Sequence, residues 1–246
     1  MVAFGAMRVR SLSASGFAAA LVIGTLSVSA GWSWGILLIA HFAAASVLSR
    51  IGEDEKAGLA ESMLEKGAQR DARQVLANGG LYGLAALAYQ ISGCPLWYAV
   101  GIGALAASAA DTWATEIGAL ATQTPVSIIS GRPVSVGTSG GVTVTGSVAA
   151  LGGAVFIAAG ATFARWPVPF TAVVLGGLAG ALSDSLLGAT LQARRWCDAC
   201  EKATERRVHD CGRPTRHTGG LAALENDGVN AVCSVVGALI ALLLTR

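Results

Sequence analysis

Seven long apolar stretches, separated by polar segments, dominate the pattern of this chain. We expect helices at about residues 12–30, 32–49, 75–92, 96–121, 143–163, 170–191 and 222–244. Most of these stretches approach the length of about 20 residues that a helix needs to cross a bilayer. Three longer polar loops join them, at residues 50–74, 122–142 and 192–220. The pattern predicts an all-α, polytopic transmembrane bundle of about seven helices, forming one membrane domain over residues 1–246.

The composition agrees with a membrane protein. Hydrophobic residues make up 53% of the chain and charged residues only 13%, whereas soluble domains carry about 25% charged residues. The 32 glycines would let transmembrane helices approach one another closely. The net charge of +2 is too small to indicate a nucleic-acid partner. The composition therefore excludes a soluble enzyme and a disordered chain.

The distribution of basic residues predicts the orientation. Cytoplasmic loops of membrane proteins carry an excess of Lys and Arg. With the N-terminus in the cytoplasm, only Arg165 and Arg246 of the 17 basic residues would lie outside. A cleavable signal peptide fits less well, because a second apolar span follows without a mature domain between them. We expect a multi-pass protein of the cytoplasmic membrane, with its long loops and its active face in the cytoplasm.

Four acidic residues interrupt or border the apolar helices, namely Asp111, Glu116, Asp184 and Asp227. Charge inside a membrane helix is costly and marks a functional hypothesis. With alternating helix directions, these acids and Asn78 would lie at a similar depth beneath the cytoplasmic surface. Clustered carboxylates, with Asn and Thr oxygens, are ligands for Mg²⁺. The alternative is that each acid pairs with an arginine or caps a helix.

A loop rich in Gly, Ser and Thr leads into the fifth apolar helix. Such a loop at a helix N-terminus can hold phosphate through backbone N–H groups and the helix dipole. Arg132 would add a clamp for the anion. The loop lacks the Gly-Lys-Ser/Thr of a Walker A motif, and an ordinary turn is the alternative. The candidate nucleotide-binding residues are Gly137, Thr138, Ser139, Gly140 and Gly141.

Further polar groups stand at the starts of two helices. Asn226 and Asn230 share a helix face beside Asp227, and a helix N-cap explains only the first of them. Arg70 and Arg73 precede the third apolar helix and would bind a phosphate or a lipid headgroup. An ordinary juxtamembrane basic patch is the alternative for these two arginines.

The third loop contains a possible metal motif. Cys197 and Cys200 are followed by His209 and Cys211, which together offer the four ligands of a tetrahedral zinc site. Disulfides are rare in the cytoplasm, so structural zinc and free thiols are the two interpretations. His41, within an apolar helix, is interpreted as a packing residue.

Five blocks of the sequence resemble a known family. They are residues 70–80, 110–118, 131–146, 184–192 and 226–230. The family is the integral-membrane family that includes the phytyl-phosphate kinases of plants and cyanobacteria, together with many uncharacterised bacterial and archaeal members. The resemblance covers most of the chain from about Arg70 onward.

The resemblance implies a kinase that transfers phosphate from a nucleoside triphosphate, with CTP as one candidate, to a prenyl monophosphate. Asp111, Glu116, Asp184 and Asp227 would hold Mg²⁺, assisted by Asn226 and Asn230. The 131–141 loop would bind the nucleotide phosphates. Arg70 and Arg73, near Asn78, would hold the acceptor phosphate.

Two other functions stay open at this point. Gly-rich helices with intramembrane acids also fit a transporter or lipid-phosphate carrier. The run from His217 to Gly220 is similar to the His-Gly-Gly signature of lipid-phosphate cytidylyltransferases, but it contains an inserted Thr, and only one of the paired aspartates is present. Membrane lipid is an expected partner under every reading, and the sequence leaves the oligomeric state open.

Overall fold

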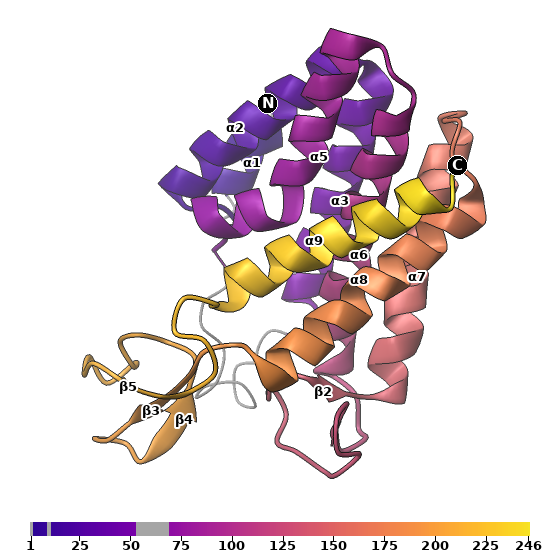
Figure 1. Ribbon diagram of the computed structural model, residues 1–246. Helices are drawn as coiled ribbons and strands as arrows, with labels where there is room; N and C mark the ends of the chain where they lie inside the picture. Colours follow the sequence, from indigo (N-terminus) through magenta and orange to yellow (C-terminus); the bar gives the residue numbers. More distant parts are fainter. Residues whose placement is uncertain (1, 9–10, 53–68) are drawn as a thin grey trace.

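The computed structural model describes residues 2–8, 11–52 and 69–246, and Figure 1 shows a bundle of long helices. The seven long helices of this part match the seven apolar stretches, so the predicted helical membrane bundle is confirmed. A short helix at the N-terminus was not expected. The helices are α1 (Val2–Arg8), α2 (Ala14–Ala30), α3 (Trp32–Arg50), α5 (Ala72–Ser92), α6 (Leu96–Gly118), α7 (Val144–Phe163), α8 (Phe170–Thr190) and α9 (Asn226–Leu243).

Four of the described helices are long and apolar enough to cross a membrane: α3, α7, α8 and the last helix, taken to Thr245. Helix α2 is apolar but has only 17 residues. Large apolar side chains face outward on these helices; Val144 and Val148 of α7, for example, are 70% and 65% exposed. A soluble protein would bury such side chains, whereas a lipid-facing surface favours them.

Helix α6 is the centre of the bundle. Every residue from 101 to 110 on this helix is buried. Helices α7, α8 and α9 pack on it at short range because the facing residues are small. A Cβ atom on Gly180 of α8 would stand 2.3 Å from the Cβ of Ala107, so only glycine permits this approach. The central position of α6 fixes Asp111, which follows directly on its buried stretch.

Two small sheets form in the loops, which the all-α expectation omitted. Strand β1 (Val126–Ser127) pairs antiparallel with β2 (Gly141–Val142). In the second sheet, β3 (Arg194–Cys197) lies between β4 (Lys202–Thr204) and β5 (Arg216–Gly219). Strands of two to four residues are too short to show the alternation by which a sequence reveals a strand, so the sequence predicts only loops here.

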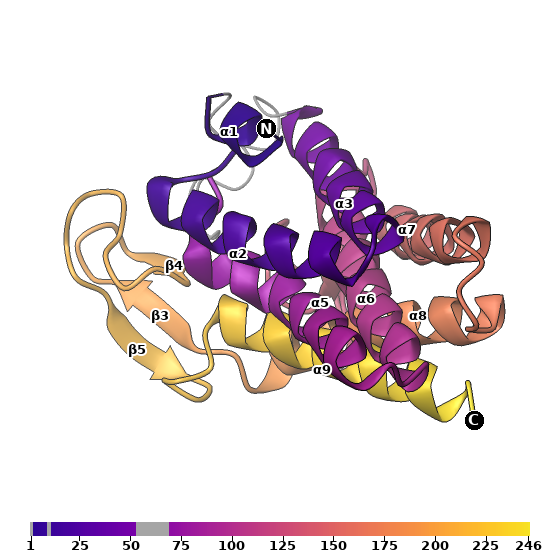
Figure 2. The ribbon, with the colours of Figure 1, turned by 90° about the horizontal axis from the view of Figure 1, so that it is seen from above.

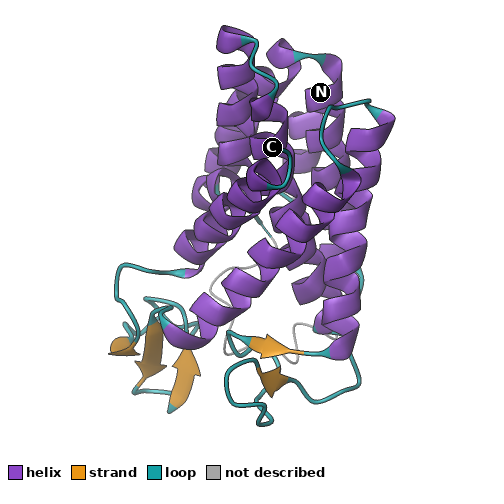
Figure 3. Ribbon diagram, turned by 45° about the vertical axis from the view of Figure 1, so that its right-hand side comes forward, coloured by secondary structure: helices purple, strands orange, loops and turns teal. Residues whose placement is uncertain are grey.

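Both sheets lie at the same end of the bundle (Figures 1 and 3). Seen from above, the three-stranded sheet projects to one side, next to the start of α9 (Figure 2). The end of α6, the start of α7, the end of α8 and the start of α9 therefore meet at one end. This is the relative arrangement that the alternating helix directions predict, while the cytoplasmic placement of this end stays a prediction.

Candidate functional site

An acidic pocket lies where α6, α7 and α8 meet the loop that joins α6 to α7. Its volume is about 530 Å³, within the range of about 300–1,000 Å³ that is usual for small-molecule sites. Among the described residues that line it, none is Lys, Arg or His. The pocket therefore suits a cation, or an anion that carries its own metal ion. Its acidic residues are Asp111, Glu116, Asp184 and Glu205.

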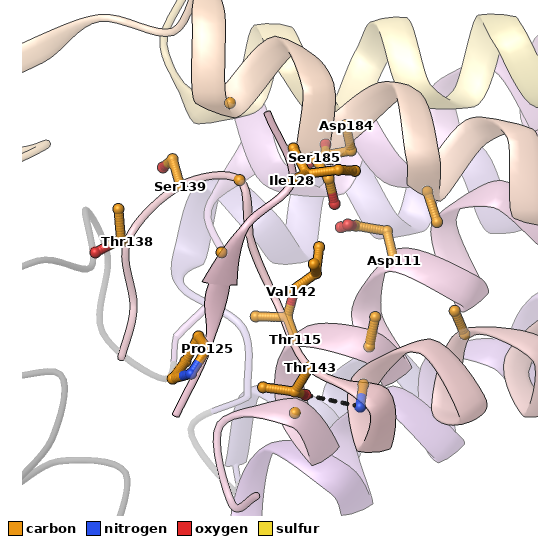
Figure 4. Close-up of a pocket in the computed structure, with 18 of the residues that line it drawn as sticks. Asp111, Thr115, Pro125, Ile128, Thr138, Ser139, Val142, Thr143, Asp184 and Ser185 are labelled. Carbon is orange, nitrogen blue, oxygen red and sulfur yellow. Dashed lines mark hydrogen bonds between the residues drawn. The ribbon is translucent and has the colours of Figure 1, made fainter. Parts of the chain in front are cut away.

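Asp111 and Asp184 come from neighbouring helices and face the same space. The charges of Asp184, Asp111 and Glu205 are close enough to interact. Oδ2 of Asp184 is buried and has no hydrogen-bond partner within residues 2–8, 11–52 and 69–246. Two carboxylates held together away from water repel each other, and either a bound cation or protonation of one of them relieves this repulsion. In Figure 4 the Asp111 carboxylate points toward the side of the pocket where Asp184 and Ser185 lie.

Neutral oxygen donors accompany the two acids. Thr115 lies one turn beyond Asp111, Ser185 follows Asp184, and Asn226 begins α9. All three line the pocket. Mg²⁺ is held in proteins by one or two carboxylates, with waters and substrate phosphates completing its octahedron. The residues present therefore fit a magnesium–phosphate complex better than a metal enclosed by protein ligands alone.

The Gly-rich loop closes the pocket against α8. Gly140 has a φ of +76°, and a Cβ atom there would stand 2.7 Å from the carbonyl oxygen of Ser185 and 2.4 Å from the Cβ of Ala189. Glycine meets both demands, since it tolerates positive φ and has no Cβ. The loop thus lies against α8 beside the residue that follows Asp184.

This loop and the start of α7 offer backbone donors to an anion. The N–H of Gly141 donates within the loop, to the carbonyl of Thr138 at 2.9 Å. Within the described residues, no backbone carbonyl accepts a hydrogen bond from the N–H of Ser139 or of Gly140. Thr143 caps α7 by accepting from the N–H of Gly146 at 2.9 Å (dashed in Figure 4). A helix N-terminus beside a glycine loop favours phosphate binding.

Glu116 lines the pocket but makes contacts on another side. Ser49 of α3 donates to Glu116 at 2.6 Å, and Arg70 donates to Ser49 at 3.0 Å and to Ser46 at 3.1 Å. Burial lowers the pKa of Arg70, while the nearby Glu116 carboxylate raises it. The pairing alternative therefore describes Glu116 and Arg70, whose contacts join α6 and α3 to the segment before α5.

Other predicted residues lie outside the pocket. Arg132 and Arg73 are exposed, and neither of them lines the pocket. Asn78 accepts a hydrogen bond from Ser108 at 3.2 Å, and the Ser108 hydroxyl also bonds to Nε2 of His41 at 3.3 Å. His41 is 7% exposed, in agreement with a packing role.

The structure thus divides the predicted site residues into two groups. One group lines a single pocket: Asp111, Glu116, Asp184, Gly137, Thr138, Ser139, Gly140, Gly141 and Asn226. The pocket lining does not include the other group: Arg70, Arg73, Asn78, Arg132, Asp227 and Asn230. The position of each acid along its helix places all of them near one end of the bundle. The rotation of each helix about its axis, and the partners of each side chain, decide which acids face the pocket.

Glu205 is a pocket residue that sequence reasoning missed. It follows β4 and accepts a hydrogen bond from Ser139 of the Gly-rich loop. Its surroundings in the sequence are polar, so no change of hydropathy distinguishes it from a solvent-exposed loop acid. Only the folding of the 192–220 loop against the 122–142 loop brings it into the site.

The pocket also has an apolar extension. Ala150 of α7 and Leu178, Ala181 and Leu182 of α8 line it, deeper in the bundle than Asp184. Leu182 is 53% exposed. The polar end of the pocket therefore continues into an apolar space between two helices that face lipid.

Comparisons with known proteins place the chain in a family. The family model described as integral membrane protein DUF92 matches residues 1–238. Protein PGR of Arabidopsis thaliana is 32% identical over 94% of this chain and 88% of its own length. The uncharacterized membrane protein MJ0933 of Methanocaldococcus jannaschii is 30% identical over 87% of this chain and 77% of its own.

A second plant relative is more distant. Protein VTE6, chloroplastic, of Arabidopsis thaliana is 27% identical over 97% of this chain and 66% of its own length. No solved structure matches the chain. The family match over nearly the whole chain confirms the resemblance seen in the sequence blocks. The chain is a multi-pass membrane protein and belongs to the DUF92 family of integral membrane proteins.

Proposed function

We propose that this protein is a Mg²⁺-dependent kinase that phosphorylates a prenyl monophosphate to the diphosphate, using a nucleoside triphosphate. One observation carries the proposal: the Gly-rich loop lines one pocket with the Asp111 and Asp184 carboxylates, and the N–H groups of Ser139 and Gly140 donate to no backbone carbonyl of the described residues. Phosphoryl transfer needs positioning and charge neutralisation more than covalent chemistry. The pocket supplies donors for phosphate oxygens and carboxylates for the metal ion.

The roles of the residues follow from their positions. Asp111 and Asp184 would hold Mg²⁺, and Mg²⁺ would neutralise the phosphate charge that this acidic pocket otherwise repels. The N–H groups of Ser139 and Gly140 would bind nucleotide phosphate oxygens. The acceptor is already an anion, so the transfer requires no strong general base. Asp227 and Asn230, which follow Asn226 in the first turns of α9, would assist it.

The apolar extension supports a lipid-like acceptor. A prenyl chain gains about 0.8 kcal/mol for each CH₂ group that leaves water. Leu178, Ala181 and Leu182 offer such a surface directly beside the acids. The phosphate head would then lie at the metal while the tail passes between α7 and α8 toward lipid. We place the site at the cytoplasmic face of the inner membrane, because the basic residues favour that orientation.

Two alternatives predict different products. A cytidylyltransferase acting on a lipid phosphate would release pyrophosphate, whereas a kinase releases a nucleoside diphosphate. A transporter or carrier would release neither, and a pocket at one end of the bundle fits alternating access less well than a midplane site. The test is product analysis of the purified protein in detergent, with Mg²⁺, CTP or another nucleoside triphosphate, and a panel of prenyl monophosphates. Nucleoside diphosphate in equal amount to prenyl diphosphate supports the kinase; pyrophosphate would contradict it.

A further inference from the structure

We propose that Cys197, Cys200, His209 and Cys211 form a structural zinc site that holds the three-stranded sheet together. The ligand atoms of these four side chains all lie within 4.8 Å of one another. Among the described residues, it is the group in which three or more His, Cys, Asp or Glu side chains bring their ligand atoms this close together. The proposal is independent of the kinase activity.

The distances between the ligand atoms are those of a tetrahedral zinc site. Zn–S bonds of about 2.3 Å and Zn–N bonds of about 2.0–2.1 Å, at tetrahedral angles, place two sulfurs about 3.8 Å apart and S and N about 3.5 Å apart. The sulfurs of Cys197 and Cys211 are 3.7 Å apart, and Nδ1 of His209 is 3.4 Å from the sulfur of Cys211. The observed spacing leaves room for one ion between them.

The backbone is shaped as two turns that present their ligands to one point. Cys197 ends β3 and Cys200 lies in the turn to β4, where Glu201 adopts a φ of +52°. In the second turn, Gly212 follows Cys211 with a φ of +78° and donates its N–H to the carbonyl of His209 at 2.8 Å. A positive φ is uncommon for a residue other than glycine, and at Glu201 it forms part of the tight turn between Cys200 and β4.

Other interpretations of the cluster fit less well. The sulfur separation of 3.7 Å is too long for a disulfide bond of about 2.05 Å. Iron–sulfur clusters are usually held by four thiolates, whereas this cluster contains a histidine. Three thiols and one imidazole at tetrahedral spacing form the Cys₃His ligand set of closed structural zinc sites. All four positions are taken by protein, so the ion would have no catalytic role.

The zinc site would act on the pocket through the sheet. Strand β4, which begins two residues after Cys200, leads directly to Glu205, which accepts from Ser139 of the Gly-rich loop. Two arginines of the 192–220 loop, Arg195 and Arg207, form ion pairs with Glu225 at 3.5 and 2.5 Å. Glu225 is the residue immediately before α9. The sheet is small and exposes much of its surface. A domain that cannot build a large core usually needs a metal or disulfides to hold its shape.

The test is the metal content of the full-length protein, purified in detergent without chelators and without a metal-affinity step. We expect about one zinc ion per chain by plasma mass spectrometry. Cys197→Ser and Cys211→Ser should each remove the zinc. The matched control is Cys94→Ser, which changes a thiol in the turn before α6 and should retain it. Wild-type protein of a single size that holds less than about 0.1 zinc ion per chain would overturn the proposal, as would loss of zinc in Cys94→Ser.

A second measurement decides the question if the cysteine variants do not fold. Wild-type protein is alkylated in detergent, with and without a zinc chelator, and each cysteine is followed by peptide mass spectrometry. Protection of Cys197, Cys200 and Cys211 that the chelator removes supports the site. Equal alkylation in both conditions would contradict it. Both readouts are independent of turnover, so an inactive protein that binds zinc would refute the kinase and leave this inference intact.

Discussion

Ser139 donates a hydrogen bond to Glu205, and this contact joins two loops that lie far apart in the sequence. Ser139 belongs to the Gly-rich loop between α6 and α7, and Glu205 follows β4 between α8 and α9. The Gly-rich loop also packs directly on α8 through Gly140. Its position over Asp111 and Asp184 therefore depends on contacts from both sides.

Removing the Ser139–Glu205 contact should weaken nucleotide binding. A hydrogen bond to a charged group contributes about 1.5–3 kcal/mol, and loss of the lower figure corresponds to about a tenfold rise in the nucleotide KM. We expect this rise for Ser139→Ala and for Glu205→Ala, with no further rise when the two are combined. Glu201→Gln, an exposed change in the nearby turn, is the control. Strictly additive effects of the two variants would argue against the contact.

Gly140→Ala should displace the loop, and Gly131→Ala provides a matched comparison. Both glycines have positive φ, +76° and +64°, but a Cβ on Gly131 meets nothing within 4 Å. Gly131→Ala should therefore lower the free energy of unfolding only by the cost of a left-handed backbone conformation, about 1–2 kcal/mol. Gly140→Ala adds a clash with Ser185 and Ala189 worth about 1–3 kcal/mol.

The two variants are compared by thermal unfolding in detergent and by nucleotide KM. Gly140→Ala should melt at the lower temperature and should bind nucleotide more weakly. Gly131→Ala should keep the wild-type KM. If both variants behave alike, the loop does not pack on α8 as described.

Glu116 and Arg70 should couple energetically, because Ser49 bridges them. Glu116→Gln and Arg70→Ala should each lower the melting temperature. Residues that share one network show interaction energies of about 0.5–3 kcal/mol in a double-mutant cycle. The fall in melting temperature of the double variant should therefore be smaller than the sum of the falls in the two single variants. Independent, additive shifts would instead return Glu116 to the group of metal-binding candidates.

Leu182→Trp should hinder the acceptor but not the nucleotide. Leu182 lines the apolar extension between α7 and α8, and a larger side chain would fill the path of the prenyl tail. We expect the KM for a long prenyl monophosphate to rise about tenfold, since one or two buried CH₂ groups are worth about 1.4 kcal/mol. Leu186→Trp, one turn along α8 and outside the pocket lining, is the control. An unchanged acceptor KM in Leu182→Trp would contradict this path.

The bundle could be predicted from the sequence because its signal is long and repeated. An apolar run of about 20 residues predicts a helix without any knowledge of what packs against it. Seven such runs predict seven long helices and their order along the chain. The alternating helix directions also predict that Asp111 and Asp184 lie toward the same end of the bundle, where both line one pocket. The short strands could not be predicted, because β1 to β5 have two to four residues each and depend on contacts between loops.

The individual site residues were harder to predict than their region. Arg70 looked like a phosphate ligand by charge, but its guanidinium donates to Ser46 and Ser49, which sequence spacing could not reveal. Asp227 lies next to Asn226, yet a rotation of about 100° per residue in a helix leaves only Asn226 in the pocket lining. Glu205 lacked any local signal, because its place depends on the packing of two loops.

The most direct test of the central claim is transfer of the labelled γ-phosphate of a nucleoside triphosphate to a prenyl monophosphate, measured with Mg²⁺ in wild type and in Asp184→Asn. Ser183→Ala is the matched control, since among the described residues the Ser183 hydroxyl donates within its own helix, to the carbonyl of Gly180. We expect Mg²⁺-dependent label in prenyl diphosphate from wild type and Ser183→Ala, and a loss of about 10²–10³-fold in Asp184→Asn with folding preserved. Asp184→Asn that transfers label at the wild-type rate, or wild type that transfers none to any acceptor, would contradict the account.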